Sequence, residues 1–252
     1  PFPQPAEPVS PGGHLLEADG VSSKDQDKIQ LYRAIGTENE VRGILRQILH
    51  EKLPLDTVEI AYTVSNPYLT MLVDASETLD IPIAFAGGIP IHLTRPGQAL
   101  LGFYSWISSH FALADLLSLC RSELLTFQDV LEEGAYLDPH HAAAILQQSP
   151  ITHQRHAYKK GFDRLEEDLK SRKAEAEREG YQPGRLDTEQ DLLLQTRNVI
   201  DLLLELVPSE PTTITEMIEK GCHFLDTFAP VRTERDTTAK KALEGILKSL
   251  NT

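Results

Sequence analysis

Hydrophobic and polar positions change their spacing several times in the first third of the chain. Apolar residues recur every three or four positions in residues 38–52 and again in residues 68–79, which predicts two amphipathic helices. Three short apolar or alternating runs separate and flank these helices, and each is typical of a strand: KIQLYRAI (28–35), TVEIAYT (57–63) and IPIAF (81–85). The order strand–helix–strand–helix–strand, with short connections, predicts an α/β fold with a small three-stranded parallel sheet.

Polar residues before the two predicted helices suggest how each helix begins. Thr37 precedes the first helix and is expected to cap its free amide groups. Ser65 and Asn66 stand before the second helix, with Pro67 at an early position where its missing amide hydrogen costs little.

From about residue 96 the spacing is helical throughout, and no convincing strand appears after about residue 110. Prolines separate the apolar stretches, as expected between helices. The division predicted from the sequence is therefore an extended linker at 1–27, rich in Pro, Gly and Ser, a partial α/β domain at 28–95, and a helical domain of about six helices at 96–252.

A sheet of only three strands poses a physical problem. Parallel sheets are normally covered on both faces, and an uncovered edge strand exposes unpaired backbone groups. We therefore expect the helical domain, the linker or a second copy of the chain to cover that edge, so self-association through the sheet edge is one expected interaction.

Composition and charge narrow the function classes. The 252 residues are 40% hydrophobic and 25% charged, which is ordinary for a globular protein, but the net charge is −14. So acidic a surface excludes a nucleic-acid platform over the whole molecule, and any DNA contact must be local. No apolar run approaches the roughly 20 residues that span a bilayer, so no membrane association is expected. The chain begins without methionine, as expected for a piece of a longer protein.

The motifs of common catalytic sites are absent from the sequence. It contains no GxxxxGK[ST] phosphate loop, no GxGxxG, and no HExxH, CxxC or GxSxG. His153 and His156 are spaced to share a helix face but have no acidic or cysteine partner at a matching offset, so surface histidines are expected rather than a metal site. The paired carboxylates Glu132/Glu133 and Glu166/Glu167 are expected on solvated faces, and Cys120 and Cys222 are expected to be small buried residues.

Three stretches carry a resemblance to a known family. They are LYRAIGTENEVRGIL, VEIAYTVSNPYLTMLVDASETLDIPIAFAGG and LTRPGQALLGFYSWISS. The region from Leu31 to about Trp106 resembles the second, RecA-like motor domain of superfamily 1 DNA helicases of the UvrD/RecB type. It is most similar to the AddB-like subunits of helicase–nuclease complexes, and the helical remainder resembles the domain inserted into that motor.

The resemblance implies a DNA-repair function that this chain does not catalyse by itself. It implies no cofactor here, with ATP and Mg expected only with other domains of the parent helicase or exonuclease. It implies single-stranded DNA and other domains or subunits of a repair complex as partners, and a cytoplasmic location. In place of the acidic–basic run that follows Arg95 in the family, this chain has Pro-Gly-Gln-Ala. That difference favours a second interpretation, a motor-inactive structural or protein-interaction module.

The resemblance also implies nucleic-acid-binding residues, each with a structural alternative. Asn66, with Ser65 beside it, is expected to contact DNA where a strand ends, or to cap a helix. Gly87 and Gly88 permit close approach of a DNA backbone, or a turn with positive φ. Arg95 is expected to meet a phosphate or an acidic side chain. Three aromatic side chains are candidates for base stacking or for core packing: Tyr62, Tyr104 and Trp106.

Overall fold

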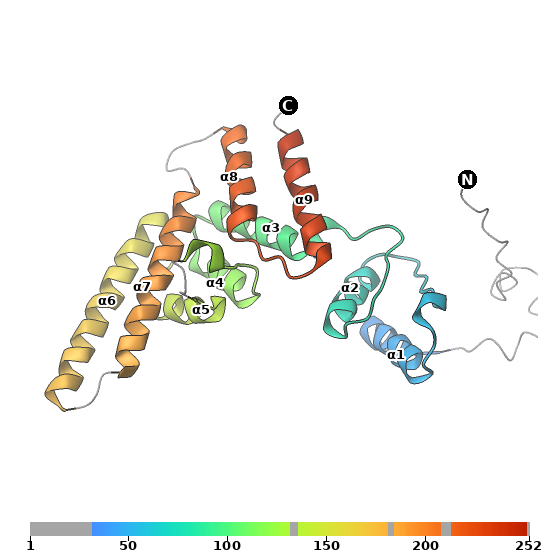
Figure 1. The fold of residues 1–252 in the computed structure, drawn as a ribbon, viewed down its shortest axis with the longest axis horizontal. Helices are drawn as coiled ribbons and strands as arrows, with labels where there is room; N and C mark the ends of the chain where they lie inside the picture. Colours follow the sequence, from blue (N-terminus) through green and yellow to red (C-terminus); the bar gives the residue numbers. More distant parts are fainter. Residues whose placement is uncertain (1–31, 132–135, 181–183, 208–212, 251–252) are drawn as a thin grey trace, which may run out of the picture. The chain divides into compact units, whose positions relative to one another are not determined.

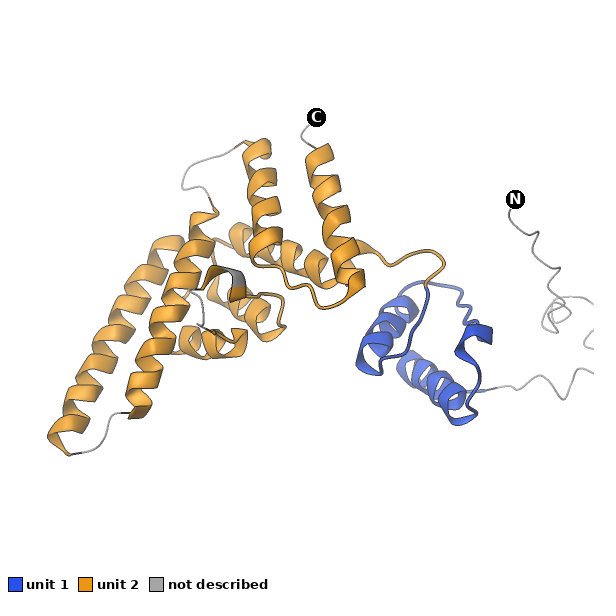
Figure 2. Cartoon of the chain, viewed as in Figure 1, with its two compact units in different colours: residues 1–84 blue, residues 85–252 orange. Residues whose placement is uncertain are grey.

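The computed structural model describes residues 32–131, 136–180, 184–207 and 213–250. The chain forms two compact units, residues 1–84 and 85–252 (Figure 2). The linker expected at 1–27 and the first half of the segment 28–35 lie outside the described residues.

The described part of the first unit consists of two α-helices, a 3-10 turn and extended connections. Helix α1 (Thr37–His50) and helix α2 (Tyr68–Thr78) pack side by side, with the turn η3 (Leu55–Thr57) between them in sequence (Figure 1). The apolar face predicted for α1 lies inward. The buried apolar side chains of this unit come from α1, from α2 and from the segment that follows α2. They are Val41, Leu45, Ile48, Leu69, Leu72, Val73 and Ile81.

The predicted α/β class is wrong, because no strand occurs in the described residues and both units are helical there. Residues 58–62 and 81–85 have no regular secondary structure, and no segment among the described residues pairs with them as a strand. Alternation is present at 58–61, where Val58 and Ile60 are half-buried and their neighbours exposed. Alternation alone does not make a strand, because a ladder needs a second segment to accept and donate its hydrogen bonds. The sheet edge expected to mediate self-association therefore has no counterpart in the described residues.

The caps proposed for the first two helices are also corrected. Gly36, with φ of 85°, stands at the N-cap of α1 and Thr37 is already helical, while Pro67 is the N-cap of α2. Neither helix receives a side-chain cap hydrogen bond, so their ends are held by backbone bonds such as Glu40 N–H to Gly36 O at 3.1 Å.

The second unit is helical in its described parts, as the spacing after residue 96 predicted. Its described part includes two 3-10 turns, η4 (Ile91–Leu93) near its start and η5 (Gln128–Val130). Its α-helices are α3 (Arg95–Ser108), α4 (Leu113–Arg121), α5 (Pro139–Gln148), α6 (Arg155–Arg178), α7 (Gly184–Glu205), α8 (Ile214–Thr227) and α9 (Glu234–Ser249).

Figure 1 shows the arrangement of these helices within the unit. The two long helices α6 and α7 run side by side, α8 and α9 form a second pair, and α3 passes against both α8 and α9. Several helices begin with side-chain caps: Asp138 accepts from the backbone N–H of His140 at 2.7 Å, and Thr233 and Asp236 form a reciprocal capping box on α9.

One aromatic core holds the second unit together. The Phe103 and Phe224 rings of α3 and α8 stack with centroids 4.2 Å apart. Trp106 of α3 meets Tyr158 of α6 edge to face, with centroids 5.9 Å apart. All four side chains are fully buried, so the core connects helices that lie far apart in sequence.

The surface of the α6–α7 pair carries ion pairs. Lys170 bonds Glu166 one turn away at 2.6 Å. Arg197 of α7 reaches Asp163 at 2.8 Å and Glu166 at 3.3 Å on α6. None of the described helices is long and apolar enough to cross a bilayer.

Candidate functional site

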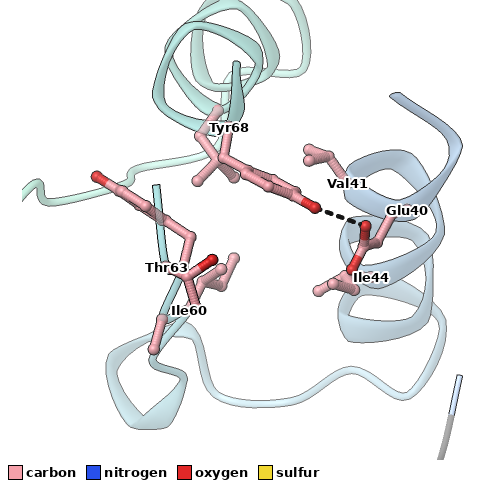
Figure 3. A pocket seen from close by; sticks show the side chains of 9 residues that line it. Glu40, Val41, Ile44, Ile60, Thr63 and Tyr68 are labelled. Atoms are coloured by element: carbon pink, nitrogen blue, oxygen red, sulfur yellow. Dashed lines mark hydrogen bonds between the residues drawn. The ribbon is translucent and has the colours of Figure 1, made fainter. Parts of the chain in front are cut away.

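A small hollow in the first unit lies between α1, α2 and the extended segment 58–64 (Figure 3). It has a volume of about 190 Å³. Nine residues line it: Glu40, Val41, Ile44, Ile60, Ala61, Tyr62, Thr63, Tyr68 and Leu72. We call it the tyrosine pocket, because two tyrosines from opposite ends of one short loop stand in its wall.

The helices place the lining residues by simple periodicity. Val41 and Ile44 are three positions apart on α1 and share its inward face, with Glu40 at the edge of that face. Tyr68 is the first residue of α2 and Leu72 follows one turn later. Ile60 is half-buried in the extended segment opposite. The pocket therefore has an apolar floor and a carboxylate on one side.

Glu40 and Tyr68 are joined by the one polar contact drawn across the pocket. The Tyr68 hydroxyl donates to Glu40 Oε2 at 2.8 Å (Figure 3). That hydrogen bond raises the pKa of Tyr68 above its usual range, with smaller contributions from partial burial and from the nearby negative charge. The phenol thus remains a neutral donor. No other hydrogen bond or ion pair to the Glu40 carboxylate occurs within the part of the chain that the structure describes.

The rings of Tyr62 and Tyr68 face one another across the loop 62–68. Their centroids lie 6.4 Å apart and their planes differ by 14°. Tyr62 is 38% exposed, so its side chain is partly open to solvent. The other aromatic candidates belong to the core: Trp106 is fully buried, and the half-buried Tyr104 donates its hydroxyl to the Met217 carbonyl at 3.0 Å.

Ser65 and Asn66 lie in the loop between the two tyrosines, and both are exposed. The capping role considered for them is wrong, because Pro67 is the N-cap and no side chain bonds to the first turn of α2. Only the backbone of Ser65 is used, its carbonyl accepting from Leu69 N–H at 2.6 Å. Both side chains are therefore exposed in the loop between the two tyrosines, and neither caps α2.

Gly87, Gly88 and Arg95 belong to the second unit. The amide of Gly88 donates to the Phe85 carbonyl at 2.9 Å, and its φ is +74°, so a turn accounts for this glycine. A Cβ at either glycine would meet nothing within 4 Å. Arg95 is the first residue of α3 and is half-buried. Ser65 and Asn66 are in the first unit, so the structure defines no single site containing all five predicted residues.

The described residues contain no group of three potential metal ligands. The exposed His153 contacts the Thr152 hydroxyl at 3.1 Å, and His140 contacts Glu123 at 3.2 Å. Glu166 is engaged by Lys170 and Arg197, whereas the pair Glu132/Glu133 lies outside the described residues.

Sequence reasoning missed Glu40 and Tyr68 as site residues. Glu40 is one of two acidic residues in the first turn of α1, and its partner is 28 positions away. The available signal was the pair of tyrosines that flank Ser65 and Asn66 at positions 62 and 68.

Comparisons with protein-family models, with curated proteins and with solved structures gave no match to this chain.

Proposed function

We propose that this chain is a non-catalytic segment of a superfamily 1 DNA-repair helicase or helicase–nuclease subunit of the UvrD/RecB/AddB type. In this proposal it contributes a local contact to single-stranded DNA and couples neighbouring domains of a cytoplasmic repair complex. The observation that supports it most is the state of Ser65 and Asn66. The residues Ser65 and Asn66, which the family resemblance selects for DNA contact, are exposed and cap no helix, and they lie in the loop between the two tyrosines of the pocket.

The charge of the first unit sets the strength expected of this contact. Residues 32–84 contain eight acidic and four basic side chains, so little of the affinity can come from phosphate neutralisation. Amide and hydroxyl groups together with aromatic rings bind a single strand with less dependence on salt than a basic groove does. Binding should therefore be weak and local.

The test is a titration of the chain with a single-stranded oligonucleotide at low salt. Asn66→Ala should weaken binding severalfold, because one hydrogen-bonding side chain at the proposed contact is lost. Thr70→Ala is the matched control, since Thr70 is exposed on the following turn of α2. Equal affinities for the wild type and Asn66→Ala, or no binding at all, would overturn the DNA-contact proposal. Arg95→Ala tests the second unit separately.

The proposal assigns no ATP hydrolysis to this chain. The sequence contains no phosphate loop, so ATP and Mg are expected to act only where other domains of the parent protein provide their sites. A hydrolysis assay with added single-stranded DNA should give no activity above the blank, and DNA-stimulated hydrolysis would contradict the non-catalytic assignment.

A second candidate function is a structural or protein-interaction module of a multi-subunit repair complex. It is favoured by the exposure of apolar side chains in the first unit, where eight large hydrophobic residues are exposed and seven are buried. The exposed ones are Tyr32, Ile35, Leu49, Leu53, Leu55, Tyr62, Val64 and Leu79. Where such side chains lie together, they are available for contact with another polypeptide.

Hydrogen exchange separates this second function from DNA contact. Co-expression with neighbouring domains of the parent protein should slow exchange of the amides of residues 58–64, which have no partner segment in the described chain. If the neighbouring domains slow this amide exchange and no oligonucleotide binds at low salt, the function is that of the interaction module.

A further inference from the structure

We propose that the tyrosine pocket binds one unpaired guanine base of a single strand, held between Tyr62 and Tyr68 and recognised by the Glu40 carboxylate. This inference rests on the proposed function, because it names the part of a DNA strand that the first unit contacts. It adds a base preference, which a contact limited to the sugar–phosphate backbone does not have.

The ring geometry supports a planar ligand. Carbon contacts are optimal at about 3.5 Å, so a flat ring between two others requires centroids roughly 7 Å apart. The rings of Tyr62 and Tyr68 are 14° from parallel with centroids 6.4 Å apart. Tyr62 stands in an extended segment that no strand ladder holds, and it is 38% exposed. A small outward movement of this one side chain therefore opens the pair to the required separation.

The size of the pocket limits the ligand to a base. Its volume of about 190 Å³ lies below the roughly 300 Å³ at which pockets for drug-sized ligands begin. Apolar side chains form the floor that a flat ring would cover, namely Val41, Ile44 and Leu72. No Lys or Arg lines the pocket, so the phosphates of a strand must stay outside it, where the exposed Ser65 and Asn66 offer neutral hydrogen bonds.

Glu40 selects among the bases by hydrogen-bond direction. An ionised carboxylate only accepts hydrogen bonds, and Glu40 already receives one from Tyr68 on Oε2. Guanine presents two adjacent donors on its Watson–Crick edge, the ring N1–H and the 2-amino group. Adenine presents a donor beside an acceptor, cytosine a donor beside an acceptor, and thymine a donor flanked by two carbonyl oxygens. Only guanine matches a carboxylate without placing an acceptor against it.

The experiment is calorimetric titration at low salt with three ligands. They are an oligothymidine, the same strand with one central guanine, and guanosine monophosphate alone. The guanine-containing strand should bind roughly tenfold more tightly than oligothymidine, within the range of one good base-reading pair. If guanosine monophosphate binds and neither oligonucleotide does, the pocket takes free nucleotides, and the proposal that it binds a base of a strand is overturned.

Matched variants test the two parts of the pocket. Glu40→Gln should abolish the preference for guanine, whereas Glu38→Gln removes the same charge from an exposed position on the same helix and should preserve it. Tyr62→Ala should weaken binding of the guanine strand by roughly fivefold or more through loss of a stacking surface, whereas Tyr62→Phe keeps the ring and should retain binding. Helix content measured by circular dichroism checks that each variant is folded.

The outcomes separate this inference from the proposed function. Oligonucleotide binding that depends on Asn66 but is equal for both strands would retain DNA contact and overturn the guanine pocket. A guanine preference that survives Glu40→Gln would also overturn the pocket assignment. Absence of binding to every ligand at low salt would remove both proposals.

Discussion

The indole N–H of Trp106 donates a hydrogen bond to the hydroxyl of Tyr158 at 3.0 Å, with both side chains fully buried. The same hydroxyl donates to the carbonyl of Phe111 at 3.0 Å. Burial raises the pKa of Tyr158 far above its usual range, so the phenol stays neutral. One hydroxyl group therefore links α3, α6 and the turn that follows α3.

Tyr158→Phe should lower the free energy of unfolding of the second unit by about 1–3 kcal/mol, because it leaves the buried indole N–H without an acceptor. Chemical denaturation followed by circular dichroism measures this change. The control is Tyr104→Phe, which removes a bond to the Met217 carbonyl from a half-buried ring that water reaches. An equal effect of the two substitutions would contradict the importance of burial.

Gly97 and Gly245 form a matched pair for substitution by alanine. A Cβ at Gly97 would lie 1.9 Å from the backbone oxygen of Ile91, whereas a Cβ at Gly245 in α9 meets nothing within 4 Å. Gly97→Ala should destabilise the unit by about 1–3 kcal/mol through overpacking against the backbone. Gly245→Ala should stabilise it by about 0.5–1 kcal/mol, since alanine favours a helix. Thermal unfolding compares the two, and changes of the same sign would be inconsistent with the structure.

Glu123 should make the second unit sensitive to acid. The Arg232 guanidinium, and then His140, hydrogen-bond its carboxylate and hold the pKa of Glu123 below its usual range. A carboxyl whose pKa is lowered by folding contributes stability above its unfolded pKa of about 4.3, and that stability is lost as the pH falls through the folded value. Denaturation at pH 7 and pH 3 should show a smaller pH dependence for Glu123→Gln than for the wild type.

Glu175→Gln is the control for that acid sensitivity, because Glu175 is exposed on α6 and is one of the described acids without an ion pair. It should behave as the wild type does at both pH values. The Glu123 assignment fails if Glu123→Gln and the wild type lose the same stability between pH 7 and pH 3.

The two cysteines should differ in reactivity. Cys120 is fully buried, and burial raises the pKa of its thiol to about 12. Cys222 is half-buried and its pKa is also raised by burial. A thiol reagent at pH 8 should therefore modify Cys222 slowly in the native protein and reach Cys120 only after unfolding. Cys222→Ser should remove the native reaction, and rapid labelling of two thiols without denaturant would show that Cys120 is accessible.

The helices could be predicted because their signal is local. Val41, Leu45 and Ile48 follow the spacing of one helix face, and all three are buried. The strands could not be predicted in the same way. Residues 57–63 have the alternation of a strand, but sheet formation depends on another segment lying alongside, and no local pattern encodes that segment. The helix caps failed for a related reason, since a backbone turn at Gly36 replaced the hydroxyl of Thr37.

The candidate site shows the same limit. Ser65 and Asn66 were selected from the sequence because the family resemblance points to their positions, and the structure leaves both exposed. The contact between Glu40 and Tyr68 depends on how α1 packs against α2, which the separate patterns of the two helices do not determine. The sequence therefore pointed to the loop that contains Ser65 and Asn66, but not to the Glu40 carboxylate in the pocket.

The chain contains a single tryptophan, and this residue is buried in the second unit. The described aromatic residues of the first unit are tyrosines only: Tyr32, Tyr62 and Tyr68. Emission from the indole is consequently an intrinsic optical probe of one unit, with no label required. A ligand that occupies the tyrosine pocket and stays local leaves that emission unchanged, whereas a spectral shift on adding DNA would report a change in the second unit, at the core around Trp106.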